Sequence, residues 1–248
     1  MKRAMSPGGP LAEILFEVSE TFRSIQGEGV HTGAPSFFVR LARCNLACSW
    51  CDTAYSWDFE RFDYAAEVTT LALDVLGERI LRESPGRVVV TGGEPLLQQK
   101  GLVQLFSWVD ARREERGEPR EFLEIETNGT VLPRAELLTR VDHWNVSPKL
   151  ASSGEPEERR LRERALTSLR DTGRASLKLV VRGDDLAEAD ALVGTLAWPR
   201  ERVVLMPEAA SRAALGERGP LIAAAALARG ARYSSRLHIE LFGGKRGV

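Results

Sequence analysis

The chain has 248 residues, 43% of them hydrophobic, and its 34 basic and 35 acidic side chains give a formal charge of -1. The hydrophobic fraction excludes disorder of the whole chain, and the even charge removes the broad attraction to phosphate that nucleic-acid binders show. The longest apolar run, residues 221–228, is too short to span a bilayer, and no secretory signal follows Arg3. We therefore expect a cytoplasmic protein with no nucleic-acid or membrane partner.

The elements expected along the chain alternate between strands and helices. Residues 1–12, rich in glycine and proline, are expected to form a flexible arm before a single core domain, residues 13–248. Apolar runs predict strands at residues 36–42, 87–91, 121–126, 143–146, 177–181 and 202–206. Helical spacing predicts helices at residues 64–82, 96–115, 134–139, 157–170, 185–196 and 212–228. A final apolar stretch, residues 236–242, closes the fold and places His238 near the last strand.

This alternation predicts βαβ units and therefore an α/β fold in which outer helices cover a parallel sheet. The sheet is expected to be either doubly wound or a barrel, complete or incomplete. The one dense charge run, residues 155–164, is typical of a solvated helix face.

The three cysteines of the chain, Cys44, Cys48 and Cys51, form a C-x-x-x-C-x-x-C motif in the loop after the first predicted strand. Their odd number argues against a disulfide framework. A structural zinc ion takes four protein ligands, so it would need a histidine such as His31 as the fourth. An iron–sulfur cube held by three thiolates leaves one iron open to a ligand. The motif therefore favours an open cluster, with buried structural thiols or a Cys3His zinc site as alternatives.

A second motif, TGGEP at residues 91–95, follows another predicted strand. Gly92 and Gly93 allow a ligand to approach the backbone closely, and Glu94 adds an acceptor for an ammonium group. A plain strand-to-helix turn is the alternative reading of this motif taken alone.

The two motifs together resemble the radical S-adenosylmethionine (SAM) superfamily, which has a partial or full (βα)6 barrel. Blocks between residues 24 and 248 are similar, within that superfamily, to the 7-carboxy-7-deazaguanine synthases; they are SIQGEG, FFVRLARCNLACSWCDTAYSWD, VTGGEP, ETNGT, SPK and GGKRGV. The resemblance implies a lyase that converts 6-carboxy-5,6,7,8-tetrahydropterin to 7-carboxy-7-deazaguanine and ammonia, on the route to 7-deazapurines such as queuosine. It also implies a 4Fe-4S cluster, SAM and Mg2+ as cofactors, a flavodoxin or ferredoxin as electron donor, and a homodimer.

Side-chain chemistry and the resemblance together predict the site residues. The carboxylate of Glu28 suits two parallel N–H donors of a pterin, Gln26 offers a donor and an acceptor, and Arg40 suits the substrate carboxylate. The expected substrate-binding residues are Ile25, Gln26, Gly27, Glu28, Arg40, Thr91 and His238. The expected cofactor-binding residues are Trp50, Cys51, Asp52, Gly93, Glu94, Glu126, Ser147, Pro148 and Lys149, with Glu126 directed at the ribose.

The remaining expected ligand is Thr53, which matches the magnesium ligand of the family. A hydroxyl is a weak ligand for Mg2+, so the substrate carboxylate and water would have to complete the site. The alternatives without a role in binding are a surface lysine for Lys149, a packed side chain for His238 and ordinary turns for the glycines around Glu28.

Two other functions compete with this interpretation. A glycyl-radical activase shares the cysteine spacing and the Gly-Gly-Glu motif but acts on a protein, and has no need for the SIQGEG loop or Arg40. A non-catalytic iron–sulfur or zinc-binding module is the alternative outside enzymes.

Overall fold

The computed structural model describes residues 14–248. The arm expected at residues 1–12 lies outside this part of the chain. The strands form one sheet in the order β3-β1-β2-β4-β5-β6-β7-β8-β9. Their bounds are Leu15–Ile25 (β1), Pro35–Leu41 (β2), Thr69–Ala72 (β3), Arg87–Gly92 (β4), Phe122–Thr127 (β5), His143–Val146 (β6), Ala175–Val181 (β7), Val203–Pro207 (β8) and Arg232–Tyr233 (β9).

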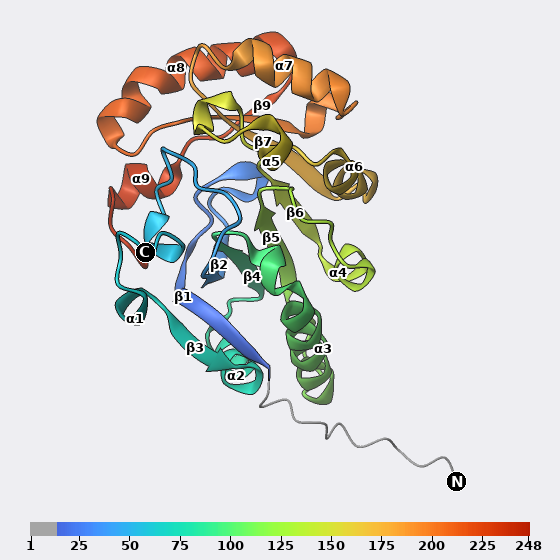
Figure 1. The fold of residues 1–248 in the computed structure, drawn as a ribbon. Helices are drawn as coiled ribbons and strands as arrows, with labels where there is room; N and C mark the ends of the chain where they lie inside the picture. Colours follow the sequence, from blue (N-terminus) through green and yellow to red (C-terminus); the bar gives the residue numbers. More distant parts are fainter. Residues whose placement is uncertain (1–13) are drawn as a thin grey trace.

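The sheet curves, and helices lie along its outer side (Figure 1). Strands β2 and β4 to β9 pair in parallel, and β3 and β9 are the two edges of the sheet among the described residues, so the barrel is partial. The helices are Tyr64–Glu67 (α1), Leu73–Glu83 (α2), Gln99–Glu115 (α3), Ala135–Arg140 (α4), Glu157–Arg160 (α5), Glu163–Asp171 (α6), Leu186–Thr195 (α7), Arg212–Arg229 (α8) and Leu237–Phe242 (α9). None of them, within residues 14–248, has the length and hydropathy needed to cross a bilayer.

The core lies between the sheet and these helices. Val88 and Val90 of β4 are fully buried and join a continuous apolar cluster with Leu105 of α3 and Leu76 of α2. Successive side chains of a strand point to opposite faces, so Val89 between them faces the inside of the curve and is also buried. Burial on both faces explains why the central strands read as unbroken apolar runs.

The helix predicted over residues 64–82 is wrong in its first half. The structure has the short helix α1, the strand β3 and only then α2. The β-branched segment before Leu73 pairs antiparallel with β1, with Thr69 opposite Val18 and Ala72 opposite Leu15. Pairing with the sheet edge has overridden an apolar spacing that also fits a helix.

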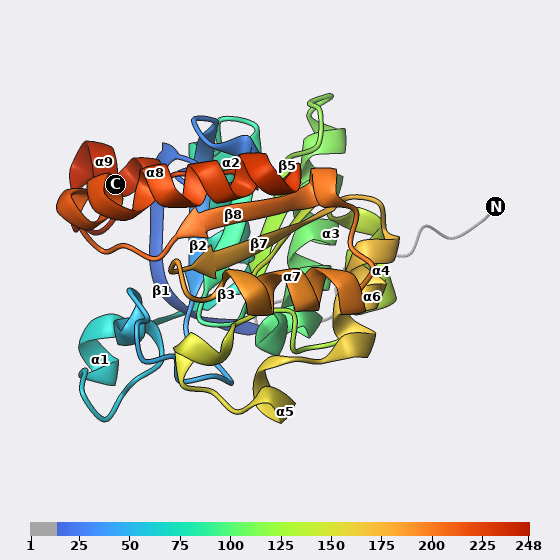
Figure 2. The same cartoon turned by 90° about the horizontal axis from the view of Figure 1, so that it is seen from above.

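Two later predictions also need correction. The helix expected over residues 157–170 is broken into α5 and α6, because Leu161 is extended and Arg162 is not helical either. The segment after Arg236 is the helix α9, so His238 is helical rather than next to a strand. Seen from above, α9 and α8 lie at the same end of the molecule (Figure 2).

Strand β1 is absent from the sequence prediction, and it runs antiparallel to β2. Its pairing is shifted by one position between Val18, opposite Leu41, and Glu20, opposite Arg40. Phe16 and Val18 therefore pack in the helix-side core, while Glu20 and Phe22 face the inside of the sheet. The mixed face pattern explains why simple alternation does not reveal the strand.

Candidate active site

A cavity of about 670 Å3 lies inside the curve of the sheet. Its wall includes side chains of β1, β2, β4, β5, β7 and β8 and the loop that carries the cysteines. The predicted site residues that line it are Ile25, Gln26, Gly27, Glu28, Arg40, Cys44, Cys48, Trp50, Cys51, Asp52, Thr53, Thr91, Gly93, Glu126, Ser147, Lys149 and His238. The fold thus brings segments from both ends of the chain to one place.

The cysteine loop is held against the end of β4. The amide of Gly93 donates to Leu41 O at 3.1 Å, and the amide of Glu94 donates to Arg43 O at 2.9 Å. A Cβ on Gly93 would lie 2.1 Å from the same Arg43 oxygen, so only glycine allows this approach. The Gly-Gly pair therefore positions the loop, in addition to leaving backbone open to the cavity.

The charge run at residues 155–164 holds the same loop from its other side. Buried Glu155 accepts a hydrogen bond from the amide of Ala47, and Arg159 donates to Asn45 O at 2.8 Å. The amide of Ser49 donates to Ser153 O at 2.9 Å. The expectation of a solvated helix face is therefore wrong for Glu155, and also for Arg160, which is 5% exposed.

The three thiols have the environment that a metal cluster needs. All are half-buried and line the cavity, and N–H groups point at two of the sulfurs: Leu46 N is 3.5 Å from Cys44 Sγ, and Trp57 Nε1 is 3.3 Å from Cys51 Sγ. Burial raises the pKa of Cys44 to about 12, so an ionised sulfur here requires a bound cation. Donors to the sulfurs and a shared open face fit an iron–sulfur cluster.

The Cys3His zinc alternative does not fit. The ring of His31 packs on His143 and Phe122, at the starts of β6 and β5, and its Nδ1 lies 2.8 Å from Glu124 Oε2. The cysteines follow the opposite, carboxyl end of β2. In residues 14–248, no three His, Cys, Asp or Glu side chains are grouped closely enough to hold a single metal ion.

On the side of the cavity next to the cysteine loop, the ammonium of Lys149 is fixed by its own turn. Its Nζ donates to Ser147 O at 3.0 Å and lies 5.6 Å from the centre of the Trp50 ring. Lys149 thus links the SPK turn to the cysteine loop and leaves a cation at the cavity wall. This arrangement differs from a free surface lysine.

Two predicted cofactor residues, Glu94 and Pro148, are buried but do not line the cavity. Glu94 caps the turn after β4: its carboxylate accepts from Leu96 N, Thr127 Oγ1 and Asn128 N at 2.7–3.0 Å. The structure therefore presents Glu94 as a support for the cavity wall, not as a free acceptor.

The side of the cavity around Glu28 contains charged residues that the sequence did not single out. Lys178 of β7 and Arg236 before α9 bracket Glu28, with Lys178 Nζ 2.5 Å from Oε2 and Arg236 Nε 3.0 Å from Oε1. Arg236 also pairs with Asp52 of the cysteine loop. Burial opposes ionisation of Glu28, but Lys178 and Arg236 hold its pKa well below the ordinary value. Glu28 is therefore a carboxylate at neutral pH.

Arg40 belongs to a second charged group that includes the end of the chain. Its Nε lies 2.9 Å from Glu20 Oε2, which also accepts from the Tyr55 hydroxyl at 2.9 Å. The guanidinium of Arg246 stacks on the Tyr55 ring at 3.2 Å and pairs with Glu67 at 2.7 Å. Residues 243–248 therefore form part of the cavity wall.

Thr53 lies at the wall with its hydroxyl 3.7 Å from Cys51 Sγ. The nearby carboxylate of Asp52 is engaged by Arg236. The described side chains thus offer Mg2+ one hydroxyl and no free anionic group beside it, so a magnesium site here needs ligands from the substrate.

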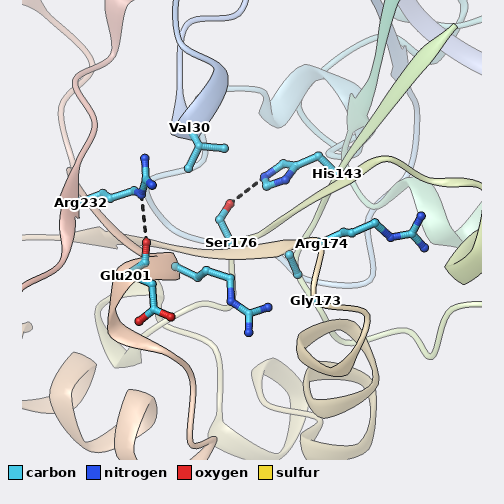
Figure 3. A pocket seen from close by; sticks show the side chains of 9 residues that line it. Val30, His143, Gly173, Arg174, Ser176, Glu201 and Arg232 are labelled. Atoms are coloured by element: carbon cyan, nitrogen blue, oxygen red, sulfur yellow. Dashed lines mark hydrogen bonds between the residues drawn. The ribbon is translucent and has the colours of Figure 1, made fainter.

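A smaller cavity of about 180 Å3 lies near the amino ends of β6 and β7 (Figure 3). His143 Nε2 and Ser176 Oγ are 3.0 Å apart in it, and burial lowers the pKa of His143 to about 4. None of the predicted site residues lines this cavity.

Comparison with known proteins agrees with this geometry. Residues 39–170 match the Radical SAM superfamily. The 7-carboxy-7-deazaguanine synthase of Pyrobaculum aerophilum is 38% identical over 93% of this chain and 96% of its own length, and that of Rhodopirellula baltica is 36% identical over 99% and 94%. The crystal structure of QueE from Escherichia coli has a TM-score of 0.67 and 27% identity, covering 92% of this chain and 96% of that one.

These matches do not favour the glycyl-radical activase or the non-catalytic module. The similarity extends over nearly the whole chain, and the superfamily match contains the cysteine loop at the cavity wall. The chain therefore belongs to the 7-carboxy-7-deazaguanine synthase family within the radical SAM superfamily.

Proposed function

We propose that the protein converts 6-carboxy-5,6,7,8-tetrahydropterin to 7-carboxy-7-deazaguanine with release of ammonia, as a step of 7-deazapurine biosynthesis. The observation that carries the proposal is the single cavity in which the cysteine loop faces Glu28, Arg40 and Lys178. A cluster at one wall and a group of polar and charged side chains at the other match a reaction between SAM and a small polar heterocycle.

When bound, the cluster and SAM supply the radical chemistry. The three thiols would hold the cluster, and Ser147, Lys149, Trp50 and Gly93 line the cavity. Thr91 Oγ1 donates to Glu126 Oε2 at 2.7 Å, which leaves the other oxygen of Glu126 directed toward Gln26 and Lys178. The protein's contribution is to orient the reactants and to exclude water.

The carboxylate of the substrate is assigned to Arg40, whose Nε is engaged by Glu20 while the side chain lines the cavity. We place Mg2+ between Thr53 and that carboxylate, with water completing its coordination. Because Thr53 alone is a weak ligand, magnesium binding is expected to depend on the substrate.

We also propose a flavodoxin or ferredoxin as electron donor, a homodimer and a cytoplasmic location. The chain has three cysteines, too few for a second cluster that could relay electrons. Thiols that must stay reduced until a cluster binds suit a reducing compartment. Dimerisation rests on the base rate for soluble oligomers.

The test is incubation of anaerobically reconstituted, reduced protein with SAM, Mg2+ and 6-carboxytetrahydropterin, followed by chromatography and mass spectrometry. We expect 7-carboxy-7-deazaguanine and ammonia in equal amounts. Cleavage of SAM without any deazaguanine would contradict the proposed substrate. Omission of Mg2+ is expected to slow product formation without releasing iron.

A further inference from the structure

The amide of Gln26, although it lines the cavity, has no spare N–H donor. Its Nε2 donates to Glu124 Oε1 at 2.9 Å and to Glu126 Oε1 at 3.3 Å, and a primary amide has two such donors. Its Oε1 accepts from the amide of Glu28 at 3.2 Å, and the residue is 2% exposed. Gln26 therefore fixes the loop, and another group must donate to a carbonyl of the substrate.

Lys178 has that capacity. An ammonium group has three donors, and within residues 14–248 one hydrogen bond of Nζ is found, to Glu28 Oε2 at 2.5 Å. The next carboxylate oxygen, Glu126 Oε1, is 3.9 Å away, which is too far for a hydrogen bond. The side chain is 5% exposed and lines the cavity, so water outside the cavity does not satisfy the remaining donors.

Glu28 has matching spare acceptors. Each of its oxygens receives one hydrogen bond, from Lys178 and from Arg236, and a carboxylate has about four acceptor positions. Arg236 is held in turn by Asp52 and by Ala209 O at 2.6 Å. Lys178 and Glu28 therefore form a fixed pair with donors on one member and acceptors on the other.

We propose that Lys178 is a specificity-determining residue: it donates a hydrogen bond to the ring carbonyl of the pterin while Glu28 accepts the adjacent N–H groups. The 2-aminopyrimidinone edge has neighbouring donors and an acceptor in that arrangement, and the pair presents the complementary pattern. This inference rests on the proposed function, because it names the part of that substrate which the pair recognises.

The experiment compares the pterin substrate with its 2,4-diamino analogue, in which an amino group replaces the ring carbonyl. Dissociation constants are measured anaerobically by equilibrium dialysis, on reconstituted holoenzyme with SAM. Wild-type protein is expected to prefer the carbonyl compound by about tenfold or more, since one hydrogen bond to a charged group has that effect. A wild-type preference below about threefold would overturn the inference, whatever any variant does.

The variants Lys178→Met and Lys178→Gln test the residue itself, and Lys100→Met is the matched control because Lys100 is exposed on α3. We expect the preference for the carbonyl compound to fall about tenfold in the methionine variant and to persist in the control. The glutamine variant, which keeps an N–H donor, is expected to be intermediate. SAM cleavage without substrate should stay at the wild-type rate in Lys100→Met.

An unchanged preference in Lys178→Met would show that Lys178 only stabilises the loop, and would overturn the proposal. If neither variant folds, the wild-type preference decides. The proposed function is tested separately. It is contradicted if wild-type protein forms no deazaguanine from the carbonyl compound, and the ratio of dissociation constants does not measure that result.

Discussion

Glu28 is a single negative charge that pairs with two buried cations, Lys178 and Arg236. Removal of one partner from a buried ion group leaves the others uncompensated, which costs about 3–5 kcal/mol. We expect Glu28→Gln to lower the free energy of unfolding by about this amount at pH 7. Urea denaturation followed by circular dichroism measures it, and Glu114→Gln on the exposed face of α3 is the control.

The pH dependence of that loss has a definite sign. Burial opposes ionisation, but Lys178 and Arg236 hold the pKa of Glu28 well below 4.5 in the folded protein. Its stabilising effect is therefore complete above pH 4.5 and is lost as the pH falls toward the folded-state pKa. The difference between wild type and Glu28→Gln should be constant near neutrality and shrink in acid. An equal loss at every pH would contradict this assignment.

Residues whose chemistry stands out in the sequence could be predicted, and residues that depend on tertiary contacts could not. The spacing of the cysteines and the arginine in an apolar strand predict positions at the cavity wall. The only sequence feature that marks Lys178 is its charge within the apolar run LKLVV, and such a charge is usually interpreted as a strand residue that faces solvent. In the structure Lys178 is buried. Arg236 had none, because its partners Glu28 and Asp52 are remote in the sequence.

At the scale of elements, the contact between the end of β4 and the cysteine loop is the critical junction. A Cβ at Gly93 would lie 2.1 Å from Arg43 O, which is backbone and cannot rotate away. We expect Gly93→Ala to lower the free energy of unfolding by about 1–3 kcal/mol and to reduce the iron bound per chain after reconstitution. Calorimetry and iron analysis measure the two effects.

Gly194 of α7 is the matched control for this substitution, because beyond its chain neighbours and the backbone of its own helix no atom of the described residues lies within 4 Å of an added Cβ. Gly194→Ala should leave iron binding unchanged and alter stability by at most about 1 kcal/mol in the favourable direction. Equal iron content in Gly93→Ala and wild type would refute the role given to this junction.

The elements that the sequence predicts well are those with one strong period. Strands buried on both faces, such as β4 and β7, and the long helices α3 and α8 appear near their expected positions. The prediction is wrong for the edge strand β3, because apolar spacing over four residues fits both the helical period and the strand period. The break between α5 and α6 follows from contacts of Glu155 and Arg160 with other segments, which no local pattern contains.

At the scale of the whole molecule, the end of the chain returns to the cavity. Arg246 anchors it through Glu67 and the Tyr55 ring, and its side chain is 46% exposed. Exposed ion pairs contribute about 0–1 kcal/mol to stability. We therefore expect Arg246→Ala to leave the unfolding transition nearly unchanged but to raise KM for the pterin several-fold.

Steady-state kinetics on reconstituted enzyme test this prediction, with Arg116→Ala as the control. Arg116 pairs weakly with Glu78, at 3.8 Å, on the helical side of the molecule. An unchanged KM in Arg116→Ala and a raised one in Arg246→Ala would separate loss of the cavity wall from loss of a surface charge. If both variants retain the wild-type KM, residues 243–248 have no part in substrate binding.

The register shift in β1 constrains how this strand can pair with the sheet. Before the shift Phe16 and Val18 pack in the hydrophobic core, and after it Glu20 and Phe22 of the same strand face the cavity. Regular pairing of the same residues would place Glu20 on the face of Val18 and turn it away from Arg40. Substitutions that keep the shift can therefore accumulate along β1, whereas a slip of one residue after Val18 would separate the site from its scaffold.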